Sequence, residues 1–301
     1  MENRPVPILL LLVAMGTAAW QQPDTDVYLV QYDPGRVPAV AGPAVNISNN
    51  PGYDNQPSFT PDGAAVLFSS NRDGAQTDVY RYDIRTRTLT QLTRTAESEY
   101  SPLVTPSGSA FSVIRVEGDG TQRLWQFDLD GTSPRVVLES IKPVGYHVWL
   151  DASRLGLFVL GAGNGPATLQ IASTAEQTAE TVASGIGRSL LMRPGTTTMS
   201  FISRAEGQPA VVMAFDPGTR TTTRIVEALE GSQDSAWDPR TGRLLMARGS
   251  VIFGWSPGET GWHELGDLSA AGLDRITRMA VAPDTGTGTL ALAVVAEVAS
   301  R

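Results

Sequence analysis

PSFTPDGAAVLFSSNRDGAQTDVYRYDIRTRTLTQLT, the stretch from Pro57 to Thr93, decides the fold of this protein because the sequence repeats it. PLVTPSGSAFSVIRVEGDGTQRLWQFDLDGTSPRVVL, from Pro102 to Leu138, follows in register 45 residues later. Both copies contain a Thr-Pro-x-Gly turn, an apolar run, and then an aromatic residue followed by aspartate. Self-similarity at a fixed period is the sequence signature of a repeat architecture.

Pro61 marks the turn of the first copy, and equivalent positions recur to the end of the sequence. A period of about 40 to 45 residues with four short strands in each unit is typical of β-propeller blades. The sequence therefore predicts an all-β, six-bladed β-propeller of four-stranded antiparallel blades. The later markers, at spacings of 45, 46, 42, 45 and 44 residues, are Pro106, Ala152, Pro194, Pro239 and Pro283.

The second strand of each unit follows the turn as a nearly continuous apolar run. Such runs are expected where both faces of a strand are covered, as they are when blades pack on one another. The six predicted second strands are Ala65–Ser70, Ala110–Val116, Leu155–Leu160, Met199–Ser203, Leu244–Ala247 and Leu290–Val298.

The two ends of the sequence supply complementary half-blades. Tyr32-Asp33 repeats the aromatic-Asp pair before the first complete unit, so Val27 to Asn49 supplies strands three and four. The last unit, Arg278 to Arg301, has room for strands one and two only. Joining them would complete a sixth blade and remove free sheet edges, whereas an open β-sandwich, the alternative, would require neither the register nor the half-blades. Other aromatic-Asp copies are Tyr82-Asp83, Phe127-Asp128 and Phe215-Asp216, with weaker versions at Ile171-Ala172 and Trp255-Ser256.

The first residues follow the plan of a secretory signal peptide. One basic residue, Arg4, precedes the apolar run Ile8–Met15, and small residues follow it. We expect cleavage after Ala19, which would leave residues 20–301 as a single propeller domain without a stable membrane span. An uncleaved anchor is the alternative, but a spanning helix needs about 20 apolar residues and this run is shorter.

Composition narrows the compartment and the partners. The 301 residues contain no cysteine, so disulfides and thiolate chemistry are excluded. Lys and Arg number 23 against 31 Asp and Glu, a net charge of −8, which argues against a nucleic-acid partner. We expect a monomeric protein that is periplasmic or secreted in a bacterium.

The string PSFTPDGAAVLFSSNRDG, followed by DVYRYDI and LTQLT, resembles the repeat of TolB-like propellers. Related propellers without catalytic function occur in prolyl oligopeptidases and dipeptidyl peptidases. TolB itself carries an α/β domain before its propeller and works with a peptidoglycan-associated lipoprotein in envelope integrity. Here the first strand is expected by Asp26, so that domain is expected to be missing, which weakens the inference of a Tol-system role.

No catalytic constellation is recognisable in the sequence. A serine hydrolase needs a Gly-x-Ser-x-Gly elbow with a histidine and an acid, and no such elbow occurs. His263 falls on a predicted outermost strand and is expected at the surface. His147, in GYHVW, is expected in a loop turned toward the central channel. It either packs beside Tyr146 and Trp149 or takes part in a site.

Metal and cofactor sites are not predicted either. Without cysteine, a metal site would have to rely on oxygen ligands for a hard ion such as calcium. The acidic segments Asn71–Gly74 and Glu117–Gly120 fall between second and third strands, where Asp-Gly is favourable hairpin chemistry. We predict no catalytic residue, no metal and no cofactor.

The loops before the innermost strands converge on the propeller axis, so they form the predicted binding face. We expect this face to bind an envelope or secreted protein or peptide without turnover. Alternatives are a carbohydrate-binding propeller, or a metal-dependent lactonase or lyase with Asp54, Glu99, Asp234 and His147 as ligands. The candidate residues are Asp54, Asn55, Glu99, Tyr100, Tyr146, His147, Arg188, Gln233, Asp234 and Arg275.

Overall fold

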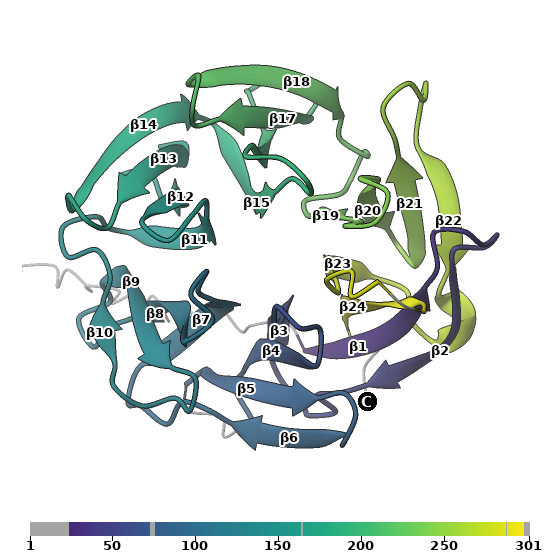
Figure 1. Cartoon of the computed structure of the whole chain (residues 1–301), viewed down its shortest axis with the longest axis horizontal. Helices are drawn as coiled ribbons and strands as arrows, with labels where there is room; N and C mark the ends of the chain where they lie inside the picture. Colours follow the sequence, from purple (N-terminus) through teal and green to yellow (C-terminus); the bar gives the residue numbers. More distant parts are fainter. Residues whose placement is uncertain (1–23, 73–75, 164, 287, 298–301) are drawn as a thin grey trace, which may run out of the picture.

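Six four-stranded sheets stand around a common axis in the computed structural model of the protein (Figure 1). The structure describes residues 24–72, 76–163, 165–286 and 288–297, and the predicted signal peptide lies outside them. The helical content of these residues is one 3-10 turn, η1 (Ser269–Ala271). No helix within them is long and apolar enough to cross a membrane. The predicted all-β, six-bladed propeller is confirmed.

Blades 1 to 5 each use four consecutive strands that run from the axis outward and pair antiparallel with their neighbours. Blade 1 contains β3 (Asp54–Phe59), β4 (Ala65–Ser70), β5 (Asp78–Asp83) and β6 (Thr88–Gln91). Blade 2 contains β7 (Ser98–Val104), β8 (Ala110–Val116), β9 (Gln122–Asp128) and β10 (Arg135–Val136). Blade 3 contains β11 (Val144–Trp149), β12 (Arg154–Val159), β13 (Thr168–Ser173) and β14 (Thr178–Ser184). Blade 4 contains β15 (Ile186–Met192), β16 (Met199–Ser203), β17 (Val211–Asp216) and β18 (Thr221–Glu227). Blade 5 contains β19 (Ala236–Trp237), β20 (Leu244–Arg248), β21 (Val251–Trp255) and β22 (His263–Asp267).

Blade 6 is built from both ends of the sequence, in the order β2-β1-β24-β23. Strand β1 pairs with β24 along its whole length, from Thr25 opposite Glu297 to Tyr32 opposite Leu290. The predicted closure by two half-blades is therefore confirmed, and the ring has no open seam between its ends. The strands are β23 (Ile276–Val281), β24 (Leu290–Glu297), β1 (Thr25–Tyr32) and β2 (Val40–Asn46).

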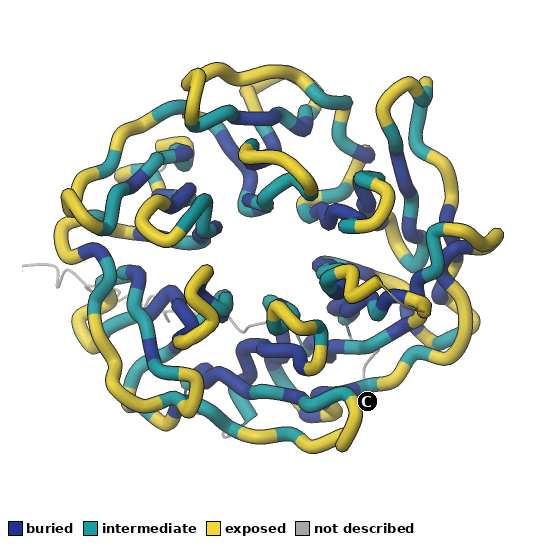
Figure 2. The backbone as a smooth tube through the Cα atoms, in the orientation of Figure 1, coloured by how far each residue is buried: buried dark blue, intermediate teal, exposed yellow. Residues whose placement is uncertain are grey.

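Burial falls from the middle of each blade to its rim (Figure 2). Second strands are buried almost throughout, as in β4, whereas the outermost β6 and β18 alternate or stay exposed. Two predicted second strands differ slightly from the structure: β12 starts and ends one residue earlier, at Arg154 and Val159, and Leu160 after it is 39% exposed. Strand β20 extends one residue further, to Arg248.

The repeated Thr-Pro-x-Gly segment forms the turn between first and second strands. The amide of Gly63 donates to the carbonyl of Thr60 at 2.8 Å, and Gly108 donates to Thr105 at 2.9 Å. Both glycines adopt positive φ, 68° and 70°, a conformation that glycine reaches without steric cost. The turn that the marker residues predict is therefore present in the structure.

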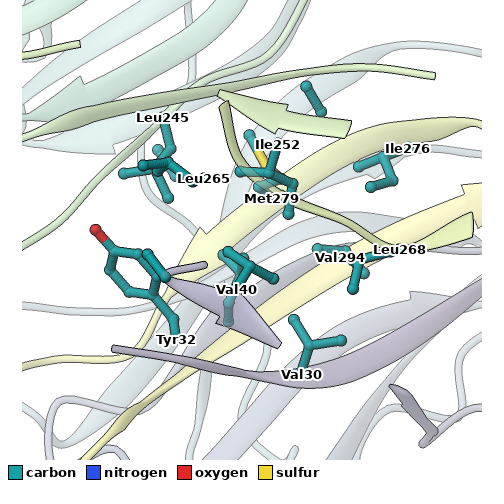
Figure 3. Packing of buried hydrophobic residues seen from close by; sticks show 14 of the residues in the cluster. Val30, Tyr32, Val40, Leu245, Ile252, Leu265, Leu268, Ile276, Met279 and Val294 are labelled. Carbon is teal, nitrogen blue, oxygen red and sulfur yellow. The ribbon is translucent and has the colours of Figure 1, made fainter. Parts of the chain in front are cut away.

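Hydrophobic side chains fill the wedges between adjacent blades. The largest cluster joins blades 5 and 6 and contains Leu292; Figure 3 shows Tyr32, Val40 and Leu265 of this cluster. The hydroxyl of Tyr32 donates to Asp238 Oδ2 at 2.9 Å, across the two blades. Burial, with the Asp238 carboxylate beside it, raises the pKa of Tyr32, so the phenol stays protonated and keeps this bond.

We expect Leu292→Ala to destabilise the protein by about 2–5 kcal/mol because it empties volume in this closed cluster. Leu292 is fully buried in β24, the strand that joins the two ends of the sequence. Urea unfolding of the purified protein measures the change. Val45→Ala, at a side chain 45% exposed on β2, serves as the control and should change stability by no more than about 0.5 kcal/mol. Equal losses in both variants would contradict this account of closure.

Candidate functional site

A cavity of about 600 Å³ opens where the loops lead into the innermost strands. Side chains from five blades line it, so its shape depends on the whole ring. Tyr53 precedes β3, Tyr146 lies on β11 and Arg188 on β15. Asp234 precedes β19, and Arg278 lies on β23.

A ring of six residues continues this cavity deeper into the channel, one from each blade. Each stands five positions before the turn marker of its blade, and a second cavity of about 110 Å³ borders all six. The innermost strands are bulged near this position, as register shifts in β3 and β7 show, and bulges re-aim side chains. The ring consists of Gln56, Ser101, His147, Ser189, Asp234 and Arg278.

Two arginines and one carboxylate dominate the chemistry of the 600 Å³ cavity, which is called the upper cavity below: Arg188, Arg278 and Asp234. Arg278 Nη2 donates to Tyr146 Oη at 2.8 Å, and its guanidinium carbon lies 5.0 Å from the centre of the same ring. Arg188 Nη2 donates to the carbonyl of Thr277 at 2.8 Å. Asp234 Oδ2 accepts a bond of 2.9 Å from the amide of Met279. Each charged group is therefore bonded to another blade: Asp234 to the adjacent blade 6, Arg188 to a blade two positions away, and Arg278 to blade 3 on the opposite side of the ring.

The electrostatics of these groups follow from their burial. Burial lowers the pKa of Arg188, and the positive charge of Arg278 lowers it further. Burial raises the pKa of Asp234, although both arginines oppose that shift. Burial would lower the pKa of Arg278, but the attraction of Tyr146 and Asp234 outweighs it, so the pKa is raised. Both arginines stay charged at neutral pH, since guanidinium groups do not lose their proton in proteins.

Six of the sequence-predicted site residues line the upper cavity. Arg275 stands at its rim, where it pairs with Glu297 at 3.0 Å and remains largely exposed. Asn55 is buried, and its side-chain oxygen accepts a bond from the backbone amide of Gln56. The six are Asn55, Tyr146, Arg188, Gln233, Asp234 and Arg275.

Asp54 and Glu99 do not reach the channel, contrary to the prediction. Both side chains are fully buried and lie at junctions between blades. The negative charge of Asp26, on β1, raises the pKa of Asp54, and the charge of Asp78, on β5, raises the pKa of Glu99. Because side chains alternate along a strand, these residues face the neighbouring blade instead of the axis.

The two junctions repeat one arrangement. Asp26 accepts a bond from the Ser48 hydroxyl at 3.0 Å, and Asp78 accepts one from the Thr93 hydroxyl at 3.2 Å. Each aspartate thereby ties the start of a third strand to the end of the fourth strand in its own blade. The first strand of the next blade then presents a second carboxylate to it.

An arginine partly compensates the second carboxylate at each junction. Arg72 Nη2 stands 4.0 Å from Asp54 Oδ1, and Arg115 Nε stands 3.4 Å from Glu99 Oε1. Even so, burial raises the pKa of Asp54 to about 6 and that of Glu99 to about 7. Desolvation therefore exceeds the attraction of the arginines at both positions.

Tyr100 and His147 also differ from their predicted positions. Tyr100 lies in β7, where its ring packs edge-on against Tyr53 at 6.2 Å and its hydroxyl accepts a bond from Thr77. It supports the cavity wall from behind. His147 lies within β11 and not in a loop, and it is 4% exposed. Burial lowers its pKa to about 3, so the imidazole is neutral.

His147 Nε2 shares a hydrogen bond of 2.7 Å with Ser112 Oγ, an arrangement that resembles a nucleophile and its base. Its Nδ1 has no hydrogen-bond partner among the described residues, so the acid that orients the histidine of a catalytic triad is missing there. Ser112 is also buried and accepts a bond from the Trp149 indole at 2.9 Å. Between blades 4 and 5, Ser200 accepts an equivalent bond of 2.9 Å from the Trp237 indole. The serine–tryptophan bond is therefore a repeated feature of the packing between blades.

The four ligands of the metal-dependent alternative are not gathered at one place. Among the described residues, no group of three or more histidine, aspartate or glutamate side chains is arranged to hold a metal ion. The acidic segment Glu117–Gly120 is a hairpin turn, in which Gly120 donates to the Glu117 carbonyl at 2.7 Å. Part of the Asn71–Gly74 segment lies outside the described residues. His263 is exposed on the outermost β22.

The sequence interpretation missed Arg278, the most buried cation of the cavity. Most of the predicted residues lie six to eight positions before their markers, whereas Arg278 stands five positions before Pro283. A signal was present, because Arg278 aligns with Asp234 and His147 at the same distance from their markers. Which of these neighbouring positions faces the axis depends on the bulges of the innermost strands.

Comparison with known proteins shows the fold. No protein-family model matches the sequence. A protein described as a putative TolB from Agrobacterium tumefaciens superposes with a TM-score of 0.71 at 13% identity, over 92% of this chain and 99% of that one. TolB from Acinetobacter baumannii gives 0.58 at 14% identity, over 77% of this chain, which spans 61% of that protein. An oligogalacturonate lyase in complex with manganese gives 0.51 at 13% identity, over 92% and 99% of the two proteins.

The fold is therefore that of TolB-like propellers, as the resemblance of the repeats indicated. The same architecture carries an enzyme in one neighbour and TolB proteins in others. Since one fold hosts unrelated activities, the site must decide the function.

We expect the contribution of Glu99 to stability to fall as the pH rises from about 4.5 to 7, because folded Glu99 holds its proton over this range and the unfolded side chain does not. Glu99→Gln removes the buried charge, while Arg115 keeps its contact with Glu97 at 2.6 Å. The variant should match the wild type near pH 4 and exceed it above pH 7 by roughly 3 kcal/mol.

Urea unfolding at pH 4, 5.5 and 8 measures this difference. The exposed Glu264, on β22, provides the control, and Glu264→Gln should show no such trend with pH. A stability gap between wild type and Glu99→Gln that stays constant from pH 4 to 8 would contradict the assignment.

Proposed function

We propose that this protein is an exported, non-catalytic β-propeller that binds a protein or peptide partner in the bacterial cell envelope. The partner docks on the loop face at the central channel. One observation carries this proposal: polar and charged groups of five blades converge on a single cavity of about 600 Å³ at that face. Concave sites with a few fixed polar groups are the usual form of binding sites.

The construction of the cavity supports recognition. Its charged groups are bonded to backbone atoms or to a tyrosine of another blade, as Arg188 is to Thr277, Asp234 to Met279 and Arg278 to Tyr146. Groups that are held before binding lose little freedom when a partner arrives. Around them the rim offers exposed polar side chains such as Gln233. A rigid centre with a polar rim suits docking of a protein segment.

The chemistry at the channel supports binding over turnover. Its histidine is neutral, buried and without an acid partner among the described residues. The serine beside it is buried and takes part in packing between blades. A general acid or base has to be accessible and to titrate near the working pH, and His147 meets neither condition.

The proposed envelope location rests on the sequence and on the fold together. The N-terminal segment has the plan of an export signal, and the sequence has no cysteine. The propeller has the fold of TolB proteins. The resemblance of its repeats to those of TolB implies a role in the cell envelope. The partner is accordingly expected among envelope or secreted proteins.

Photo-crosslinking in the bacterium that encodes the protein tests the binding face. We expect benzoylphenylalanine at Gln233, exposed at the cavity rim, to give a discrete crosslinked protein band. The same group at Ser107, exposed in the turn between β7 and β8 at the other end of the blade, should not give that band. Identical bands from both positions, or none from Gln233, would contradict the proposal.

Metal content separates the enzyme alternative. The purified mature protein should hold less than one calcium, manganese or zinc ion per molecule by mass spectrometry of the elements. A stoichiometric ion that raises the melting temperature would favour the lactonase or lyase alternative over the binding role.

A further inference from the structure

The two cavity arginines have no carboxylate partner at short range. Among the described residues, no carboxylate oxygen lies within 4.0 Å of a guanidinium nitrogen of Arg188 or Arg278, whereas Arg275 at the rim pairs with Glu297. Arg278 is only 9% exposed. Asp234 attracts both arginines but pairs directly with neither, and charged groups held in a cleft without a direct partner are candidates for a functional site.

Both guanidinium groups also keep donors that the protein does not use. A guanidinium carries five N–H donors. Arg278 donates through Nη2 to Tyr146, and Arg188 donates through Nη2 to Thr277. Arg188 Nε is buried without a hydrogen-bond partner among the described residues. Because unmade hydrogen bonds of buried groups cost free energy, these donors favour a ligand that accepts several of them at once.

The charge of the cavity differs from the charge of the rest of the molecule. The protein has a net charge of −8, whereas the centre of the cavity holds two arginines and one carboxylate, Asp234. The two like charges line the same cavity and repel each other; burial lowers the pKa of Arg188, and the charge of Arg278 lowers it further. An anion between them would relieve this repulsion. A concave site concentrates the electrostatic field of its charged groups on a ligand that enters the cavity.

Resting on the binding role proposed above, we propose that the cavity takes a single peptide carboxylate, held between Arg188 and Arg278. The carboxylate is either an acidic side chain or the terminal carboxylate of the partner. Two oxygens on one plane match the paired N–H groups of arginine, which makes such bonds short and strong. Asn55, Gln233 and Asp234 then face the amides on either side of the carboxylate.

The cavity walls favour a peptide over an acidic sugar. Sugars bind on open faces of aromatic rings, but the ring of Tyr146 is covered by Arg278 on its face and meets Phe158 at 5.5 Å. Tyr53 is buried against Tyr100. A polyuronate would also bring further carboxylates toward Asp234 and Glu297, which line the same cavity. A peptide brings one carboxylate among neutral amides.

Nuclear magnetic resonance of the arginine Nε–H groups tests this inference on the full mature protein. The probes are acetyl-Ala-Ala-Ala with a free C-terminus, acetyl-Ala-Glu-Ala-amide, and the uncharged acetyl-Ala-Gln-Ala-amide. We expect saturable shifts of the Arg188 and Arg278 signals with at least one of the two acidic peptides at millimolar concentration. The acidic peptide that binds more tightly identifies the source of the carboxylate, and the uncharged peptide should give no shift.

Variants separate recognition from folding. Arg278→Gln and Arg188→Gln should each weaken binding of the acidic peptide about tenfold. Arg188→Lys should bind more tightly than Arg188→Gln because it keeps the positive charge, and less tightly than the wild type because it lacks the paired N–H donors. Arg240→Gln, in the turn between β19 and β20 where Arg240 pairs with Asp284 at 2.8 Å, should bind as the wild type does. Circular dichroism melting identifies any variant that fails to fold. Arg188→Gln then decides the outcome if Arg278→Gln unfolds.

The outcomes distinguish this inference from the function on which it rests. If trigalacturonate binds more tightly than both acidic peptides, the peptide assignment is wrong. If no anion shifts the arginine signals while Gln233 still crosslinks a partner, the carboxylate site is wrong and the binding face stands. If acidic peptides bind while Gln233 crosslinks nothing, the carboxylate site stands and the proposed partner role fails.

Discussion

The pairing of β1 with β24 is the constraint on which the rest of the structure depends. It joins residues more than 250 positions apart, from Thr25 opposite Glu297 to Tyr32 opposite Leu290. Without it the ring would end in two half-blades with free edges and uncovered apolar faces. With it, every blade is packed between two others, and the six innermost strands are held at fixed places around the axis. The cavity exists because those places are fixed.

The junctions between blades have a second consequence. Hydrophobic clusters fill most of each wedge. The junction between blades 6 and 1 also encloses Asp54 beside Asp26, and the junction between blades 1 and 2 encloses Glu99 beside Asp78. Arginines and hydroxyl groups surround them, and burial still raises the pKa values of Asp54 and Glu99. The sequence features that look most like an acidic channel mouth are therefore part of the internal packing of the ring. The channel itself is positively charged at its centre.

The functional proposals follow from this distribution of charge. The proposed anion site rests on two arginines in the central cavity of an acidic protein, with no described carboxylate within 4.0 Å of either. The histidine in the same channel is neutral and bonded to a serine that packs between blades. The proposed recognition of a peptide carboxylate uses the two arginines that line the cavity, whereas hydrolysis would need the histidine and serine that are enclosed between blades.

The sequence by itself determined the architecture, and only the tertiary structure decided the site. The number of blades, the turns and the closure by two half-blades depend on a period, on glycine and proline positions, and on apolar runs, all of which can be read from the order of the residues. The direction of a side chain on an innermost strand cannot be read this way, because it reverses at every residue and shifts again at each bulge. Asp54 and Glu99 therefore face the neighbouring blades, while Arg278, which the sequence interpretation missed, faces the axis beside Asp234.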